Sequence, residues 1–72
     1  MEECWVVICH WVHLDEDEVK AVFRDKNKAI EYAKKIAEEE EEEIYKIKML
    51  TDNRIMIDLG ESWIEVAKAY LY

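Results

Sequence analysis

The sequence predicts an α+β fold in which one helix packs on an antiparallel sheet. Three observations along the chain support this class. Strand-like segments rich in β-branched and aromatic residues precede residue 25, apolar residues at helical spacing follow it, and apolar and polar residues alternate after residue 44. A chain of 72 residues has room for only a thin core. We therefore expect residues 1–72 to form a single α+β domain.

The first two predicted elements are strands. Residues 4–13 (CWVVICHWVH) are mostly β-branched and aromatic, which favours a strand. Neither of its alternating faces is clearly polar, which predicts a central strand with its second face partly covered or open to a partner. Residues 14–18 (LDEDE) form a polar break suited to a turn, and residues 19–24 (VKAVFR) alternate again. The two strands should pair as a hairpin.

A helix is predicted to follow Asp25, whose carboxylate can cap the free amides of a first helical turn. From Lys26 the apolar residues recur at helical spacing. The expected buried stripe consists of Ala29, Ala33, Ile36 and Ala37. At about 100° per residue, Glu40 falls on the same stripe, where an unpaired carboxylate would not be buried. The helix should therefore leave the core, or end, at about residue 39.

Two further strands are predicted after the helix. Residues 44–50 (IYKIKML) alternate, so that Tyr45, Ile47 and Met49 should face inward. A turn at TDNR leads to the returning strand at residues 54–59. The final segment, residues 62–72, fits two structures: Ser62 and Glu65 match a helix capping box, whereas apolar alternation fits a strand. The residues alone leave both open.

The net charge of −8 arises largely from one run of six glutamates, Glu38 to Glu43. This charge disfavours direct nucleic-acid binding and favours a basic protein, or a nucleic-acid-binding complex, as the partner. Two interpretations of the run are open. In the first interpretation, the glutamates mimic nucleic-acid phosphates in a basic groove, since a helical rise of about 1.5 Å per residue gives a spacing of charges of the order found in duplex DNA. Alternatively, it is the solvated end of a helix.

The helix-opening segment DKNKAIEYAKKIA after a short strand, and the stretch GESWIEV (residues 60–66), carry a resemblance. In these segments, and in the order of its elements, the chain resembles small phage-encoded α+β proteins that include type I-F anti-CRISPR inhibitors. The resemblance implies that the final segment is a strand, giving the order ββαβββ. It also implies a viral inhibitor that binds and blocks a component of a host defence complex. It carries over no binding residue.

The candidate partner-binding residues are aromatic and acidic. Trp5 and Trp11 would form an exposed patch if they share the face away from the helix, and tryptophan is enriched at binding hot spots. The alternative is that this second face is covered, for example within a homodimer. The acidic turn lacks the glycine and spacing of a calcium loop and is more typical of a solvated turn. The full set of candidates is Trp5, Trp11, Asp15, Glu16, Asp17, Glu38, Glu39, Glu41 and Glu42.

Several other site classes are disfavoured. Cys4 and His10 lie on the opposite strand face from Cys9 and His13, so at most two of these ligands converge and we expect no metal site. The two cysteines would lie about 16 Å apart along a strand, too far for a disulfide with each other. The sequence shows no Ser/His/Asp spacing, so we expect no enzyme and no cofactor. The apolar stretches are too short for a membrane span and the N-terminus is acidic, which favours a cytoplasmic location.

We therefore expect a non-enzymatic binding protein of a phage or mobile element. It would inhibit a host CRISPR-type complex by occluding a basic site, with acidic residues steering the approach and aromatic residues anchoring it. The alternative is a small structural or assembly module that forms a homodimer through its tryptophan-bearing sheet face. Recovery of a host complex in a pull-down would support the first, and recovery of the protein alone would support the second.

Overall fold

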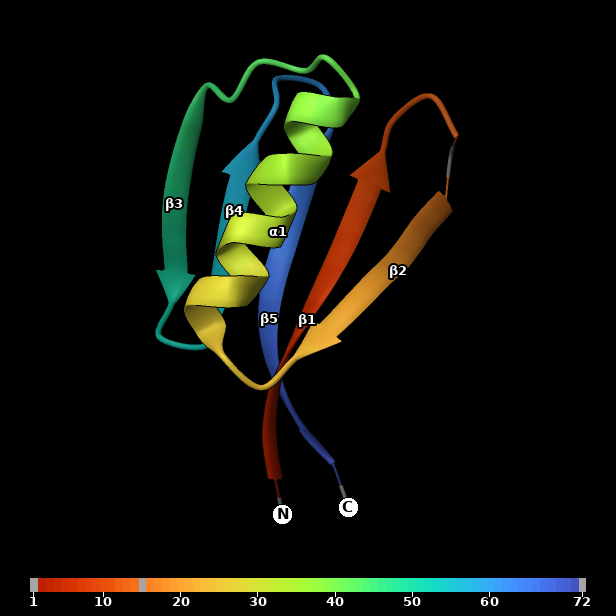
Figure 1. The fold of residues 1–72 in the computed structure, drawn as a ribbon. Coiled ribbons are helices and arrows are strands. Elements are labelled where there is room, and N and C mark those ends of the chain that lie inside the picture. Colours follow the sequence, from red (N-terminus) through yellow and green to blue (C-terminus); the bar gives the residue numbers. More distant parts are fainter. Residues whose placement is uncertain (1, 15, 72) are drawn as a thin grey trace.

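The computed structural model describes residues 2–14 and 16–71, and it confirms an α+β fold with the order ββαβββ (Figure 1). The final segment is a strand, as the resemblance implied. The elements are β1 (Glu2–Trp11), β2 (Glu16–Phe23), α1 (Lys26–Glu39), β3 (Lys46–Thr51), β4 (Arg54–Asp58) and β5 (Trp63–Leu71).

The strands form one antiparallel sheet in the order β2-β1-β5-β4-β3. The longest pairing joins β1 to β5, from Glu2 opposite Leu71 to His10 opposite Trp63. The predicted hairpin of β1 and β2 is present, with a β-bulge where the register shifts between Val7 and Ile8. The predicted interior position of β1 is confirmed, because β1 has a strand on each side.

The helix covers one face of this sheet, where it contacts β1, β2 and β5 (Figure 1). Asp25 caps it as expected, since its Oδ1 accepts hydrogen bonds from the amides of Asn27 (2.8 Å) and Lys28 (3.4 Å). The predicted buried stripe is also correct. Three of its members are alanines, whose small side chains let the helix lie close to the strands. The buried helix residues are Ala29, Ala33, Ile36 and Ala37.

Trp5 and Trp11 belong to this core, so the expectation that they form an exposed patch is wrong. They lie on the helix side of β1, with only 8% and 6% of their surface exposed. Trp5 also lies beneath Lys26, whose Nζ is 5.3 Å from the ring centroid. The two rings pack in the same buried cluster as the small alanines of the helix, whose side chains leave room beside it. The tryptophan on the opposite face is Trp63, which pairs with His10.

Strand β3 departs from its predicted burial. Its side chains are all exposed, although Ile47 and Met49 lie opposite the buried Ile57 and Ile55 and therefore point to the helix side. The alternation is as the sequence indicated, but α1 makes its main contacts with strands nearer the other edge. One helix is too narrow to shield five strands, and β3 stays uncovered.

The helix ends where the position of Glu40 predicted, through a Schellman motif. The amide of Glu41 donates to the carbonyl of Glu38 (3.0 Å), and the amide of Glu42 donates to the carbonyl of Ala37 (2.9 Å). This motif places Glu41 at φ 56°, in the left-handed region that glycine normally occupies. The chain thus turns away from the helix in the middle of the glutamate run.

The two cysteines are buried and free, and they lie on opposite faces of β1. Burial raises the pKa of the Cys9 thiol from 9.0 to about 11, with a further rise from the nearby carboxylates of Glu18 and Glu40 and an opposing effect of Lys20. Cys9 is therefore a neutral core residue at physiological pH rather than a reactive thiolate.

We predict that Glu41→Gly stabilises the protein by about 1 kcal/mol relative to Glu41→Ala, because only glycine removes the cost of the left-handed conformation. Both variants lose the same charge, so their difference isolates the backbone term. Urea unfolding followed by circular dichroism measures it. Equal stability of the two variants would show that Glu41 is not strained.

We also predict that Cys9 makes stability depend on alkaline pH. Because the folded pKa lies above the ordinary value, its contribution is complete below about pH 9 and is lost as the pH rises toward 11. The measurement compares unfolding free energies of the wild type and Cys9→Ala from pH 8 to pH 11, so that other titrating groups cancel. Their difference should be constant below pH 9 and shrink above it. A difference that does not change across the range would contradict the prediction.

Candidate partner-binding site

One end of the molecule is strongly acidic. The β1–β2 turn, the C-terminal end of α1 and the β4–β5 connection all lie at this end (Figure 1). We define the acidic end as Glu38 to Glu43 together with Glu61, all of which are exposed. Within the described residues, none of these glutamates takes part in an ion pair. Their charges are therefore available to a partner.

The glutamate run does not form the regular row of charges that phosphate mimicry along a helix requires. Only Glu38 and Glu39 are helical, Glu40 is the cap, and the left-handed Glu41 redirects the chain. Helical spacing of about 1.5 Å per residue applies to the first part of the run alone. The run instead spreads its carboxylates around the helix end.

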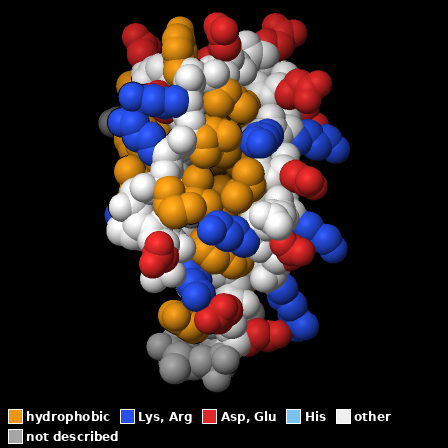
Figure 2. Space-filling model, turned by 90° about the vertical axis from the view of Figure 1, so that its left-hand side faces the viewer, with side chains coloured by type: hydrophobic (Ala, Val, Ile, Leu, Met, Phe, Trp, Pro, Cys, Tyr) orange, Lys and Arg blue, Asp and Glu red, His pale blue; other side chains and the backbone are white. Residues whose placement is uncertain are grey.

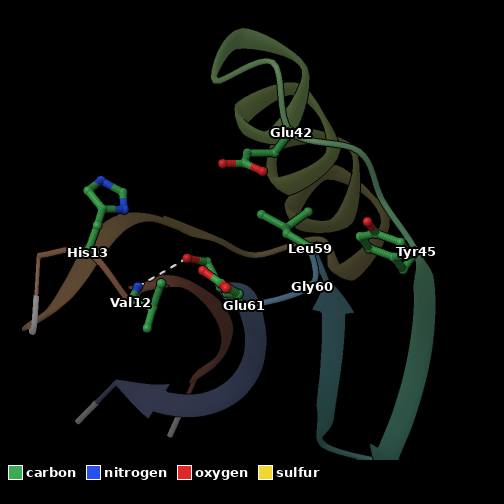
Figure 3. Close-up of a pocket in the computed structure, with 8 residues that line it drawn as sticks. Val12, His13, Glu42, Tyr45, Leu59, Gly60 and Glu61 are labelled. Carbon is green, nitrogen blue, oxygen red and sulfur yellow. Dashed lines mark hydrogen bonds between the residues drawn. The ribbon is translucent and has the colours of Figure 1, made fainter.

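A cavity of about 440 Å³ opens within this end, between the three connections (Figure 3). Its lining combines two carboxylates, the ring of a tyrosine, the imidazole of a histidine, a serine hydroxyl and aliphatic side chains. The lining residues are Val12, His13, Glu42, Tyr45, Leu59, Gly60, Glu61 and Ser62. Val12 and His13 come from the β1–β2 turn, Glu42 and Tyr45 from the α1–β3 connection, and Leu59 to Ser62 from the β4–β5 connection.

Two hydrogen bonds of Ser62 connect the walls of the cavity. The hydroxyl of Ser62 accepts from the amide of Val12 (3.0 Å), and the carbonyl of Ser62 accepts from the amide of Leu59 (3.0 Å). Ser62 is buried, and the bond between its hydroxyl and the amide of Val12 links the β1–β2 turn to the β4–β5 connection. Its hydroxyl therefore serves the architecture of the cavity.

Gly60, the one glycine of the chain, shapes the opposite wall. Its φ is 97°, and its amide donates to Asp58 Oδ1 (2.8 Å). A Cβ at this position would lie 3.1 Å from Cε2 of the Tyr45 ring. Glycine thus permits both the turn and the close approach of the Tyr45 ring. Tyr45 lies at the rim of the cavity, and 68% of its surface is exposed.

The lining suits a cationic group attached to an aliphatic stem. The carboxylates of Glu42 and Glu61 provide charge, and the face of an aromatic ring such as Tyr45 attracts an ammonium or guanidinium group. The exposed side chain of Val12 offers apolar contact to methylene groups. A lysine or arginine side chain has this combination.

A second cluster of charged side chains crosses the sheet face that carries no helix. His10 Nδ1 lies 2.7 Å from Asp17 Oδ1, and His10 Nε2 lies 3.0 Å from Glu65 Oε1. Nε of Arg54 donates to Glu65 Oε2 (2.8 Å). The His10 ring stacks on Trp63 with a centroid separation of 4.7 Å. These residues join β2, β1, β5 and β4, and the contacts of both ring nitrogens make this a structural link between strands.

The structure separates the residues that the sequence grouped as partner-binding. Glu38, Glu39 and Glu41 belong to the acidic end without lining the cavity, whereas Glu42 lines it. Trp5 and Trp11 are in the core, and Asp17 belongs to the His10 cluster. Asp15 and the side chain of Glu16 lie outside the described residues. Sequence reasoning missed most of the cavity, because its walls come from three separate connections, although the lone Gly60 and its neighbour Glu61 mark one of them.

Among the described residues, no group of three or more His, Cys, Asp and Glu side chains is placed to hold a metal ion. No helix in the described part of the chain combines the length and apolar character needed to cross a membrane. Comparison with protein-family models, curated proteins and solved structures gives no match.

We predict that His10→Ala destabilises the fold by about 1–3 kcal/mol, because it leaves the largely buried Glu65 with fewer hydrogen bonds and removes the stacking partner of Trp63. The control is Asp17→Asn, which alters an exposed partner of the same histidine and should cost less than about 1 kcal/mol. Chemical denaturation of both variants measures the costs. A smaller effect at His10 than at Asp17 would rule out a structural role for the cluster.

Proposed function

We propose that the protein is a non-catalytic acidic binding protein that occupies a basic site on a partner protein and blocks access to it. The observation that carries this proposal is the acidic end, whose glutamates are not paired within the described residues and two of which, Glu42 and Glu61, line a cavity suited to a cationic side chain. The partner contributes a lysine or arginine that enters between Glu42 and Glu61. The ring of Tyr45 forms the side of this site.

The acidic charge acts mainly on the approach of the partner. Six of the 18 acidic residues lie in the single run Glu38 to Glu43, so the field of the net charge of −8 is concentrated at one end. Such a field raises the rate of encounter with a basic surface and orients the two proteins. An exposed ion pair contributes only about 0–1 kcal/mol, so charge alone does not supply stable binding.

Apolar side chains beside the cavity supply the anchoring contacts. Val12, Leu14 and Tyr45 are large and exposed, and two of them line the cavity itself. Exposed apolar groups next to polar ones are typical of binding surfaces. These residues take the anchoring role that the sequence assigned to Trp5 and Trp11.

The blocked partner is expected to belong to a CRISPR-type defence complex, on the strength of the sequence resemblance, and this identification stays a prediction.

The second candidate function, a homodimeric assembly module, is favoured by one observation: Trp63 is exposed on the sheet face that carries no helix. Light scattering over a dilution series distinguishes a dimer of this kind from a monomer that binds a partner.

The test of the cavity uses two double variants with the same change in charge. Glu42→Gln/Glu61→Gln neutralises both cavity carboxylates, whereas Glu38→Gln/Glu39→Gln neutralises two exposed helix residues outside it. Each tagged protein is used as bait in a lysate of CRISPR-bearing bacteria, and captured proteins are quantified by mass spectrometry. A basic protein should be retained by the wild type and by the helix variant. The cavity variant should retain about tenfold less, which corresponds to about 1.4 kcal/mol. Equal capture by both variants, or capture of acidic proteins only, would contradict the proposal.

A further inference from the structure

Strand β3 is an edge of the sheet, so one side of its backbone pairs with no other strand among residues 2–14 and 16–71. It also exposes apolar side chains, with 45% of Ile47 and 63% of Met49 accessible. Figure 2, which faces this side of the molecule, shows a hydrophobic area flanked by basic and acidic side chains. An edge strand with exposed apolar groups is a template for pairing with another chain.

The other edge is less suited to pairing. Strand β2 carries the register shift opposite Val7 and Ile8, and a bulge of this kind bends and twists an edge. It exposes Val19 and Val22, and the ion pair of Glu18 and Lys20 (3.1 Å) flanks Val19 in the sequence. In β3 the register shift lies at the end of the strand, between Met49 and Thr51, and the register is regular from Lys46 to Met49. Strand β3 is therefore the edge whose regular segment, within the described residues, has no ion pair and combines exposed apolar side chains with two cations.

The two faces of this regular segment differ in chemistry. Ile47 and Met49 point to the helix side, where they continue the row of the buried Ile57 and Ile55. Lys46 and Lys48 point to the opposite face, and neither takes part in an ion pair within the described residues. A strand added here meets apolar groups on one face and two cations on the other.

These lysines argue against a second copy of the chain as the added strand. Antiparallel self-pairing centred on Ile47 sets Lys46 opposite Lys48 of the other copy, and pairing centred on Lys48 sets the two Lys48 side chains opposite each other. Like charges directly opposite each other destabilise a sheet. Pairing centred on Met49 would run into the register shift between Met49 and Thr51. A different chain is the better occupant.

We propose that β3 binds an extended segment of a partner protein that alternates apolar and acidic residues. The apolar residues of this segment face Ile47 and Met49, and its carboxylates face Lys46 and Lys48. Backbone hydrogen bonds to the free edge provide affinity, and the alternating side chains provide selectivity. This surface is separate from the acidic end, and the inference does not rest on the proposed function.

The experiment titrates the isotope-labelled full chain with a blocked peptide that alternates valine and glutamate, and follows the amide resonances by NMR. The control peptide carries lysine in place of each glutamate. The glutamate peptide should shift the amides of residues 46–51 and should bind there at least about tenfold more tightly than the lysine peptide. Any binding of the lysine peptide at Glu38 to Glu43 is read from different resonances, so failure here is distinct from failure of the proposed function.

A charge-reversed variant, Lys46→Glu/Lys48→Glu, completes the test. Both positions are exposed, so the spectrum of the folded protein should be retained, and the preference at β3 should invert in favour of the lysine peptide. Equal binding of both peptides at β3, or no shift of residues 46–51, would overturn the proposal. Shifts of these residues on raising the protein concentration without peptide would also overturn it, because they would identify a second copy as the occupant.

Discussion

The contact between the alanine stripe of α1 and the central strands is the constraint on which the rest of the structure depends. Ala29, Ala33 and Ala37 are fully or almost fully buried, and they allow the helix to lie directly on the sheet. The space beside the narrow alanine ridge is filled by large side chains, among them Trp5 and Trp11. The buried stripe ends before Glu40, whose carboxylate would fall at the next position of the stripe. The position of that glutamate therefore sets the end of the helix, which falls within the acidic end.

A single helix on five strands leaves surface uncovered, and the exposed surfaces follow from this. On the helix side, β3 keeps its alternating pattern but has no helix above Ile47 and Met49. On the opposite side, Asp17, His10, Glu65 and Arg54 link four neighbouring strands without a covering layer. These polar side chains connect the strands on the face that the helix does not cover. Strand β3, at the edge of the sheet, stays available for binding.

The acidic end shows how charge and shape contribute differently to recognition. The glutamates are numerous and exposed, so each contributes little binding energy, but together they direct the approach of a basic partner. Specificity needs a defined geometry, and here it comes from Gly60, Tyr45 and Ser62, which shape a cavity beside Glu42 and Glu61. The proposed site is thus a small cavity of defined geometry within a larger acidic surface.

The sequence by itself determined those features that depend on local periodicity. It placed the cap at Asp25, the buried stripe of α1, the end of the helix near residue 39 and the pairing of the first two strands, because each follows from neighbouring residues and the repeat of a helix or strand. The helix or strand state of residues 62–72 was open from the residues alone, since their pattern fits both periods.

Only the tertiary structure decided which face of each strand the helix covers. Alternation places Trp5 and Trp11 on one face of β1, but it does not say whether that face lies under α1, and here it does. For the same reason alternation predicts buried positions for Ile47 and Met49, which are exposed because the helix does not reach β3. The link of His10 to Glu65 depends on the register of β1 with β5. The cavity joins three connections that are distant in sequence. Charge, caps and periods are local properties, whereas faces, registers and cavities are set by the packing of distant segments.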